Sequence, residues 1–139
     1  VHKDDDKQVK VIAGKFEKAK GPVEGHNVEP TYLDVELKKE KEFNHSLPST
    51  HNTFIYLING EIKIGEEKHE RVKDSTLILL LKGESLKVKA QTNAKFLLIS
   101  GKPINEEIAR GGPFVMNTKA EILQAVQDYH NGTFVKWKQ

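Results

Sequence analysis

The 139-residue sequence contains no cysteine, which excludes both a disulfide framework and a metal site built from thiolates. It also lacks a long apolar stretch: no run approaches the roughly 18 residues that a membrane-spanning helix needs. No signal-peptide pattern opens the chain. We therefore expect a soluble cytoplasmic protein with no membrane partner, also found in the nucleus if its organism is eukaryotic.

An excess of one charge is missing as well. The chain has 22 basic and 20 acidic residues and a formal net charge of +2. The two signs alternate over short stretches, as in residues 38–42 and 66–71. Interleaved charges are typical of a solvated surface and not of a stripe that follows phosphates. We expect no direct binding to nucleic acid.

Short β-forming runs separated by turn signals fill most of the chain. Residues 32–37 and 86–90 alternate between apolar and polar, which indicates strands with one buried face. Residues 53–58, 76–81 and 95–100 are almost continuously apolar, which predicts strands buried on both faces. The Asn59-Gly60 pair predicts a type I′ hairpin turn between residues 53–58 and 61–64. The spacing favours an all-β sandwich or barrel.

The end of the chain has a different pattern. Thr118 and Glu121 fit a capping box, and apolar residues follow at helical spacing until Asn131-Gly132. This predicts one C-terminal α-helix that packs on the β body. At the other end, Asp4-Asp5-Asp6-Lys7 resembles a protease-cleavable tag, so residues 1–8 are expected to be disordered or tag-derived. Residues 9–139 are then a single domain.

Several segments resemble the pirin family, whose members are bicupins. The most specific is Gly112–Glu121 (GPFVMNTKAE), and we regard six of its residues as a family signature with a structural role: Gly112, Pro113, Phe114, Met116, Asn117 and Thr118. Residues 54–60 and 96–103 resemble further parts of a pirin C-terminal half. The resemblance implies a cupin-type β-barrel or sandwich (a double-stranded β-helix) with one C-terminal helix.

The resemblance also implies a division of labour. In pirins the N-terminal cupin holds one iron through three histidines and a glutamate. The family roles, a redox-sensitive transcriptional cofactor function and quercetin 2,3-dioxygenase activity, are attributed to that half. This chain would be a non-catalytic, metal-free cupin that gives structural support and contact surface to the N-terminal cupin, or that self-associates, with a dimer as one result.

The residues here do not match the cupin ligand pattern. By analogy with the first pirin domain, the two histidine positions fall on Ser46 and Pro48, and the glutamate position falls on Asn52, or on Thr53 if the register is one residue off. No histidine occurs in residues 85–100, where the last ligand is expected. We predict no catalytic, cofactor-binding or metal-binding residue.

Histidines elsewhere leave one weaker alternative for a metal. His45 and His51 are six residues apart, so both can face the same side of an extended segment. His26 and His69, in polar loops, are expected to be solvated. Two further functions stay open: a stand-alone small cupin dioxygenase, and a cupin that binds a small molecule in a cavity lined by its inward apolar residues.

Overall fold

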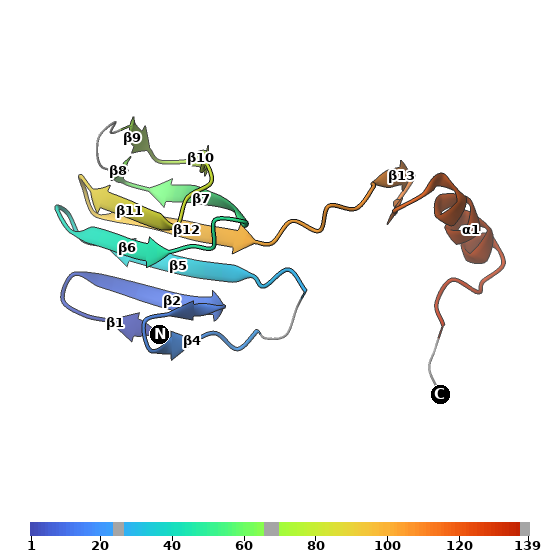
Figure 1. The fold of residues 1–139 in the computed structure, drawn as a ribbon, viewed down its shortest axis with the longest axis horizontal. Coiled ribbons are helices and arrows are strands. Elements are labelled where there is room, and N and C mark those ends of the chain that lie inside the picture. The colour runs from blue at the N-terminus through green and yellow to red at the C-terminus, as the bar shows by residue number, and fades with distance from the viewer. Residues whose placement is uncertain (24–26, 66–69, 137–139) are drawn as a thin grey trace. The chain divides into compact units, whose positions relative to one another are not determined.

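The structure is a computed structural model that describes residues 1–23, 27–65 and 70–136 (Figure 1). The chain divides into two compact units, residues 1–103 (the β unit) and residues 104–139 (the C-terminal unit). The prediction that the helix packs on the β body stays a prediction, as does the single domain over residues 9–139. His26 and His69 lie outside the described residues. No helix in the described ranges is long and apolar enough to cross a membrane.

The β unit contains two facing antiparallel sheets (Figure 1). The larger sheet has the strand order β1-β2-β5-β12-β7-β10, and the smaller has the order β6-β11-β8-β9. The strands of the larger sheet are β1 (His2–Lys3), β2 (Lys7–Ala13), β5 (Thr31–Leu37), β12 (Ala94–Gly101), β7 (Asn52–Asn59) and β10 (Thr76–Leu79). Those of the smaller sheet are β6 (Glu42–Ser46), β11 (Ser85–Ala90), β8 (Glu61–Ile64) and β9 (Glu70–Lys73). A two-stranded ribbon, β3 (Lys15–Phe16) and β4 (Ala19–Lys20), accompanies them.

The core lies between the inner faces of the two sheets. Alternation along β5 and β11 turns every second side chain inward, as the sequence predicts. The rings of Phe43 on β6 and Phe96 on β12 are fully buried, and they meet edge to face at 5.5 Å between centroids. This contact joins one sheet to the other. The all-β fold with one C-terminal helix is thereby confirmed.

The prediction of a hairpin at Asn59-Gly60 is wrong. Strand β7 pairs with β12 and β10, whereas β8 pairs with β11 and β9 in the other sheet. The Asn59-Gly60 corner therefore crosses between sheets. Of the two corner residues, Gly60 has a positive φ (90°) and Asn59 does not, whereas a type I′ turn needs a positive φ at both central positions. The chain also crosses between the sheets at residues 91–93, which connect β11 to β12. The corner lies against this crossing, since a Cβ on Gly60 would lie 2.4 Å from the carbonyl oxygen of Asn93.

The prediction that the continuously apolar strands are buried on both faces is also wrong. Inward residues of β7 are buried, but Tyr56 is 39% exposed, and Leu77 and Leu79 on β10 are 56% and 77% exposed. The smaller sheet covers only the inner face of the larger one. Six apolar side chains line the outer face of β12, β7 and β10, and we call them the outer apolar patch: Phe54, Tyr56, Leu77, Leu79, Leu97 and Ile99.

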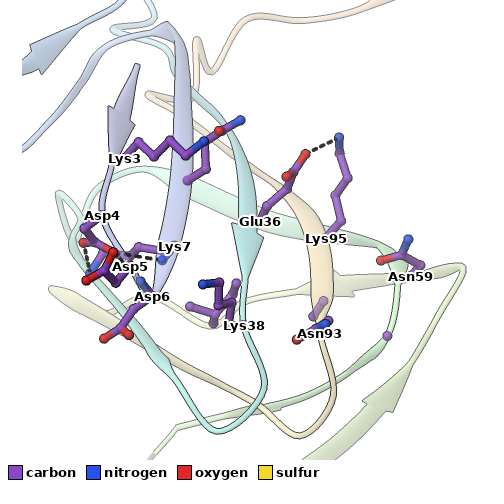
Figure 2. A pocket seen from close by; sticks show the side chains of 14 residues that line it. Lys3, Asp4, Asp5, Asp6, Lys7, Glu36, Lys38, Asn59, Asn93 and Lys95 are labelled. Atoms are coloured by element: carbon purple, nitrogen blue, oxygen red, sulfur yellow. Dashed lines mark hydrogen bonds and ion pairs between the residues drawn. The ribbon is translucent and has the colours of Figure 1, made fainter.

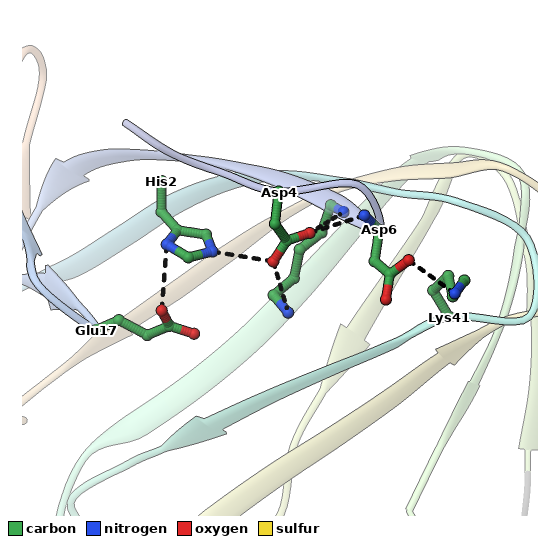
Figure 3. A network of polar contacts seen from close by, with 6 residues as sticks. His2, Asp4, Asp6, Glu17 and Lys41 are labelled. Carbon is green, nitrogen blue, oxygen red and sulfur yellow. Dashed lines mark hydrogen bonds and ion pairs between the residues drawn. The ribbon is translucent and has the colours of Figure 1, made fainter.

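The N-terminal segment is tied to the β unit by polar contacts (Figure 3). The ring of His2 on β1 lies 3.2 Å from carboxylate oxygens of both Asp4 and Glu17, and Asp6 forms an ion pair with Lys41 at 2.7 Å. Asp4 accepts hydrogen bonds from the backbone N–H groups of Asp6 and Lys7 at 2.8 Å. Residues 1–8 therefore include regular structure, and their tag origin stays a prediction.

The C-terminal unit contains a β-hairpin and one helix. Strands β13 (Ala109–Gly111) and β14 (Phe114–Met116) pair across Gly112-Pro113, and α1 covers Lys119–His130. The capping box is confirmed: Thr118 Oγ1 accepts from the backbone N–H of Glu121 at 3.2 Å, and Glu121 accepts from the N–H of Thr118 at 2.8 Å. The hydroxyl of Thr118, which donates to the Glu121 carboxylate at 2.9 Å, and the backbone N–H of Thr118 lower the pKa of that carboxyl.

Candidate functional site

The positions of the cupin ligands can be read from the segment that leads into β7. Leu47, His51 and Thr53 are buried, whereas Ser46, Pro48 and Asn52 are exposed. The buried positions 47, 51 and 53 are not a uniform shift of 46, 48 and 52, because Ser49 is exposed; of the notional ligand positions only the alternative at Thr53 coincides with a buried residue. The buried residues supply an isobutyl group, one imidazole and a hydroxyl, and of these only the imidazole of His51 is a good iron ligand.

Thr53 and Ser100 form the buried polar contact of this end of the barrel. Their hydroxyl oxygens are 2.9 Å apart, and they join β7 to β12. Sequence reasoning missed this pair because neither residue stands out in an apolar run. The contact satisfies both hydroxyls in the core and leaves them occupied with each other.

His51 is the one buried imidazole in the described part of the chain. Its side chain is 4% exposed, and Nε2 lies 3.9 Å from a carboxylate oxygen of Glu29. Its Nδ1 is buried and has no hydrogen-bond partner among the described residues. The residue lines a cavity of about 220 Å³ together with Leu47, Thr53 and Leu86.

His45 lies on β6 in an aromatic cluster. Its ring centroid is 5.7 Å from that of Phe16 and 6.1 Å from that of Phe43. Burial against these rings lowers the pKa of His45, because desolvation disfavours the charged imidazolium. His45 and His51 therefore occupy different surroundings, one among aromatic rings and one at a cavity. Within the described residues, no three His, Cys, Asp or Glu side chains group so as to hold a metal.

We expect the environment of His45 to make the β unit less stable in mild acid. The unfolded chain, with a pKa near 6.5, takes up a proton on this residue before the folded chain does. The free energy of unfolding therefore falls as the pH drops below about 6.5. Urea titrations between pH 5 and 8 measure this slope for the protein and for His45→Phe. The variant is expected to show a smaller slope; an unchanged slope would contradict the assignment.

A larger cavity lies at another place, beside the Asn59-Gly60 corner (Figure 2). It measures about 890 Å³ and is lined by residues 3–8 with parts of β5, β7 and β12. Several of its charges have partners within the chain: Lys95 donates to Glu36 at 3.0 Å, and backbone hydrogen bonds hold the pKa of Asp4 well below its usual range. Because the segment around Asp4 resembles a tag, we do not assign a site there.

The six signature residues lie in or beside the hairpin of the C-terminal unit. Gly112 has φ +57° at the first central position of the turn, and Pro113 follows it. The Phe114 ring lies 5.1 Å from that of Phe134. Asn117 donates to a Glu106 carboxylate and to the Glu107 carbonyl at 2.9 Å. Met116 pairs with Ala109 across the hairpin, and Thr118 caps α1. Their assignment as a family signature with a structural role stays a prediction.

Comparison with known proteins defines the class of this fold. Residues 32–135 match the family model of the pirin C-terminal cupin domain. In the crystal structure of a quercetin 2,3-dioxygenase from Acinetobacter baumannii, a similar fold superposes with a TM-score of 0.81 at 32% identity, covering 95% of this chain and 45% of that one. The two-sheet β unit is thus a cupin.

The sequence relatives narrow the assignment. A pirin-like protein of Solanum lycopersicum is 43% identical over 103 residues, which are 73% of this chain and 35% of that protein. A pirin-like protein of Caulobacter vibrioides is 33% identical over 127 residues, which are 91% of this chain and 45% of that protein. The chain belongs to the pirin family and matches its C-terminal cupin domain. It spans less than half the length of these relatives.

Proposed function

We propose that this domain is the non-catalytic cupin half of a pirin-type protein, and that its outer apolar patch packs against an iron-bearing N-terminal cupin. In this proposal the iron, the dioxygenase chemistry and the transcriptional cofactor role belong to the N-terminal half. The buried residues that lead into β7 support the first part, because Leu47 and Thr53 offer neither imidazole nor carboxylate and the single imidazole of His51 falls short of the ligand set that non-haem iron needs.

The outer apolar patch is the observation that carries the docking part. The strand register places Leu77 opposite Tyr56 and Tyr56 opposite Leu97, and it places Leu79 opposite Phe54 and Phe54 opposite Ile99. Two apolar rows therefore cross three neighbouring strands on one face. Contiguous exposed apolar surface of this kind marks a protein contact.

The composition of the same face limits where the partner sits. On β5, the next strand of the sheet, Tyr32, Asp34 and Glu36 face outward, and the last two are charged: Asp34 lies 3.6 Å from Lys95, and Lys95 also pairs with Glu36. The face thus has an apolar part bordered by ion pairs, as expected of an interface core with a polar rim. The share of the relatives that this chain leaves uncovered is long enough for a second cupin, which is the occupant we propose.

Charge on the patch is expected to prevent docking. In Leu77→Glu/Leu79→Glu, binding to the separately produced N-terminal half of the tomato relative should weaken about a hundredfold, because two carboxylates would be desolvated against an apolar surface. Isothermal titration calorimetry measures the affinity. Leu123→Glu, at a 71% exposed leucine of α1, is the matched control and should bind like the unmodified protein.

Self-association is the second reading of the same patch. If copies of this chain cover the patch in each other, sedimentation of the chain alone will show a concentration-dependent dimer that Leu77→Glu/Leu79→Glu converts to monomer. Equal affinity of the patch variant and of Leu123→Glu for the N-terminal half would contradict the docking proposal. A dimer lost only in Leu123→Glu would place the contact on the C-terminal unit instead.

A further inference from the structure

The cavity beside His51 has features of a binding site that the structural role does not use. It lies at the end of the barrel where β7 begins and β8 ends, and its volume is about 220 Å³. Leucine and isoleucine side chains form much of its wall: Leu47, Ile64, Leu80, Leu81 and Leu86. Polar side chains add a few directed groups, as is typical of sites for small molecules.

The polar groups of this cavity favour an acid. Lys82 and Lys87 both line it, and none of the described residues that line it carries a carboxylate. Lys87 forms an ion pair with Glu42 at 3.5 Å. Lys82 is exposed and donates to the backbone carbonyl of Thr50 at 3.3 Å, which leaves its ammonium further donor capacity. A cation at the rim of an apolar cavity suits a carboxylate with an apolar body.

His51 adds an unused hydrogen-bonding group. Its side chain is 4% exposed, and Nδ1 has no partner within the described residues. Nε2 lies 3.9 Å from Glu29, beyond hydrogen-bond distance. A buried polar group without a partner is costly, and such groups in native structures call for a ligand, a water or a functional role. Because Nδ1 has almost no solvent-accessible surface, the ring has to turn toward the cavity before a bound acceptor can satisfy it.

The volume sets the size of the ligand. An apolar cavity of about 150 Å³ holds a benzene molecule, so about 220 Å³ has room for one ring or a short branched chain together with a carboxylate. We propose that this cavity binds a small monocarboxylic acid with a compact apolar body, its carboxylate held by Lys82 and His51. The proposal concerns a different surface from the outer apolar patch and does not depend on docking.

Benzoate is the probe for this site. In a titration followed by amide NMR shifts, we expect saturable changes at Leu80 and Leu86, with benzyl alcohol at least about tenfold weaker because it lacks the charge. Lys82→Gln should weaken benzoate binding about tenfold. His51→Phe, which keeps the ring shape without its nitrogens, should also weaken it. Lys102→Gln, an exposed lysine outside the lining, is the matched control.

Four results would overturn the proposal. Benzoate that causes no saturable shifts up to millimolar concentration excludes the site. Equal affinity for benzoate and benzyl alcohol shows an apolar cavity without acid selectivity. Equal weakening in Lys82→Gln and Lys102→Gln assigns the effect to general charge. Leu47→Phe, which fills the cavity without touching the charges, should abolish binding; retained binding in this variant places the ligand elsewhere.

Discussion

Replacing Phe43 by alanine should lower the free energy of unfolding of the β unit by about 3–5 kcal/mol, the range for large aromatic deletions in a core. The ring is fully buried. It stacks on Phe16 at 5.3 Å and meets Phe96 of the facing sheet at 5.5 Å, so its loss leaves a cavity that neither sheet can fill alone. A loss of this size is a large part of the stability of a single domain.

Urea denaturation followed by far-UV circular dichroism measures this effect. Phe54→Ala is the matched control, since it deletes the same side chain from the half-buried outer face of β7 and should cost much less. If Phe43→Ala fails to fold, Phe43→Leu still gives a measurable loss. Equal losses at Phe43 and Phe54 would contradict the view that only the inner face of the larger sheet forms the core.

Replacing Gly60 by alanine should cost about 3 kcal/mol, from the clash of the new Cβ and from a positive φ that side chains disfavour. The Cβ would lie 2.4 Å from the backbone oxygen of Asn93 and 2.8 Å from the Cα of Ala94. Both contacts are with backbone, so no flexible side chain can move away. The Asn59-Gly60 corner and the β11–β12 connection, which both cross between the sheets, would have to separate.

Gly83→Ala provides the comparison for Gly60→Ala. A Cβ on Gly83 meets nothing within 4 Å. The free energy of unfolding of Gly83→Ala should therefore stay within about 0.5 kcal/mol of that of the unmodified protein. The same urea titration reports both. If Gly60→Ala is as stable as Gly83→Ala, then the close approach of the two crossings is not a feature of the protein in solution.

The sequence predicted the local features well where one physical rule applied. Alternation identified β5 and β11 and their buried faces, because a strand with one covered face needs a period of two. The capping box at Thr118 and Glu121 appears with both of its reciprocal hydrogen bonds. Each of these signals depends on residues that are near one another in the chain.

Long-range pairing could not be read from the same signals. Asn59-Gly60 marks a sharp corner correctly, but whether β7 and β8 pair depends on strands far along the chain. The ligand register was displaced for a related reason: a turn in which the N–H of His51 donates to the Pro48 carbonyl interrupts the period of two. Counting residues through such a turn does not give the inward face.

The continuously apolar runs form the outer apolar patch, which the sequence alone did not predict to be exposed. Residues 53–58, 76–81 and 95–100 have the composition of strands covered on both sides, yet the smaller sheet covers one side. In our proposal the second cover comes from another cupin. Under this proposal, the composition of these strands reflects their burial by a partner, which the single chain does not show.

Bound iron on the purified protein tests the central claim most directly. After anaerobic addition of iron(II) and removal of the excess, elemental mass spectrometry should find well under one equivalent per chain, because Leu47 and Thr53 are not iron ligands and the buried imidazole of His51 has no second and third ligand grouped with it among the described residues. His45→Ala and His51→Ala should leave that value unchanged. One equivalent of iron that is lost in either variant would contradict the claim and would place metal chemistry in this cupin half itself.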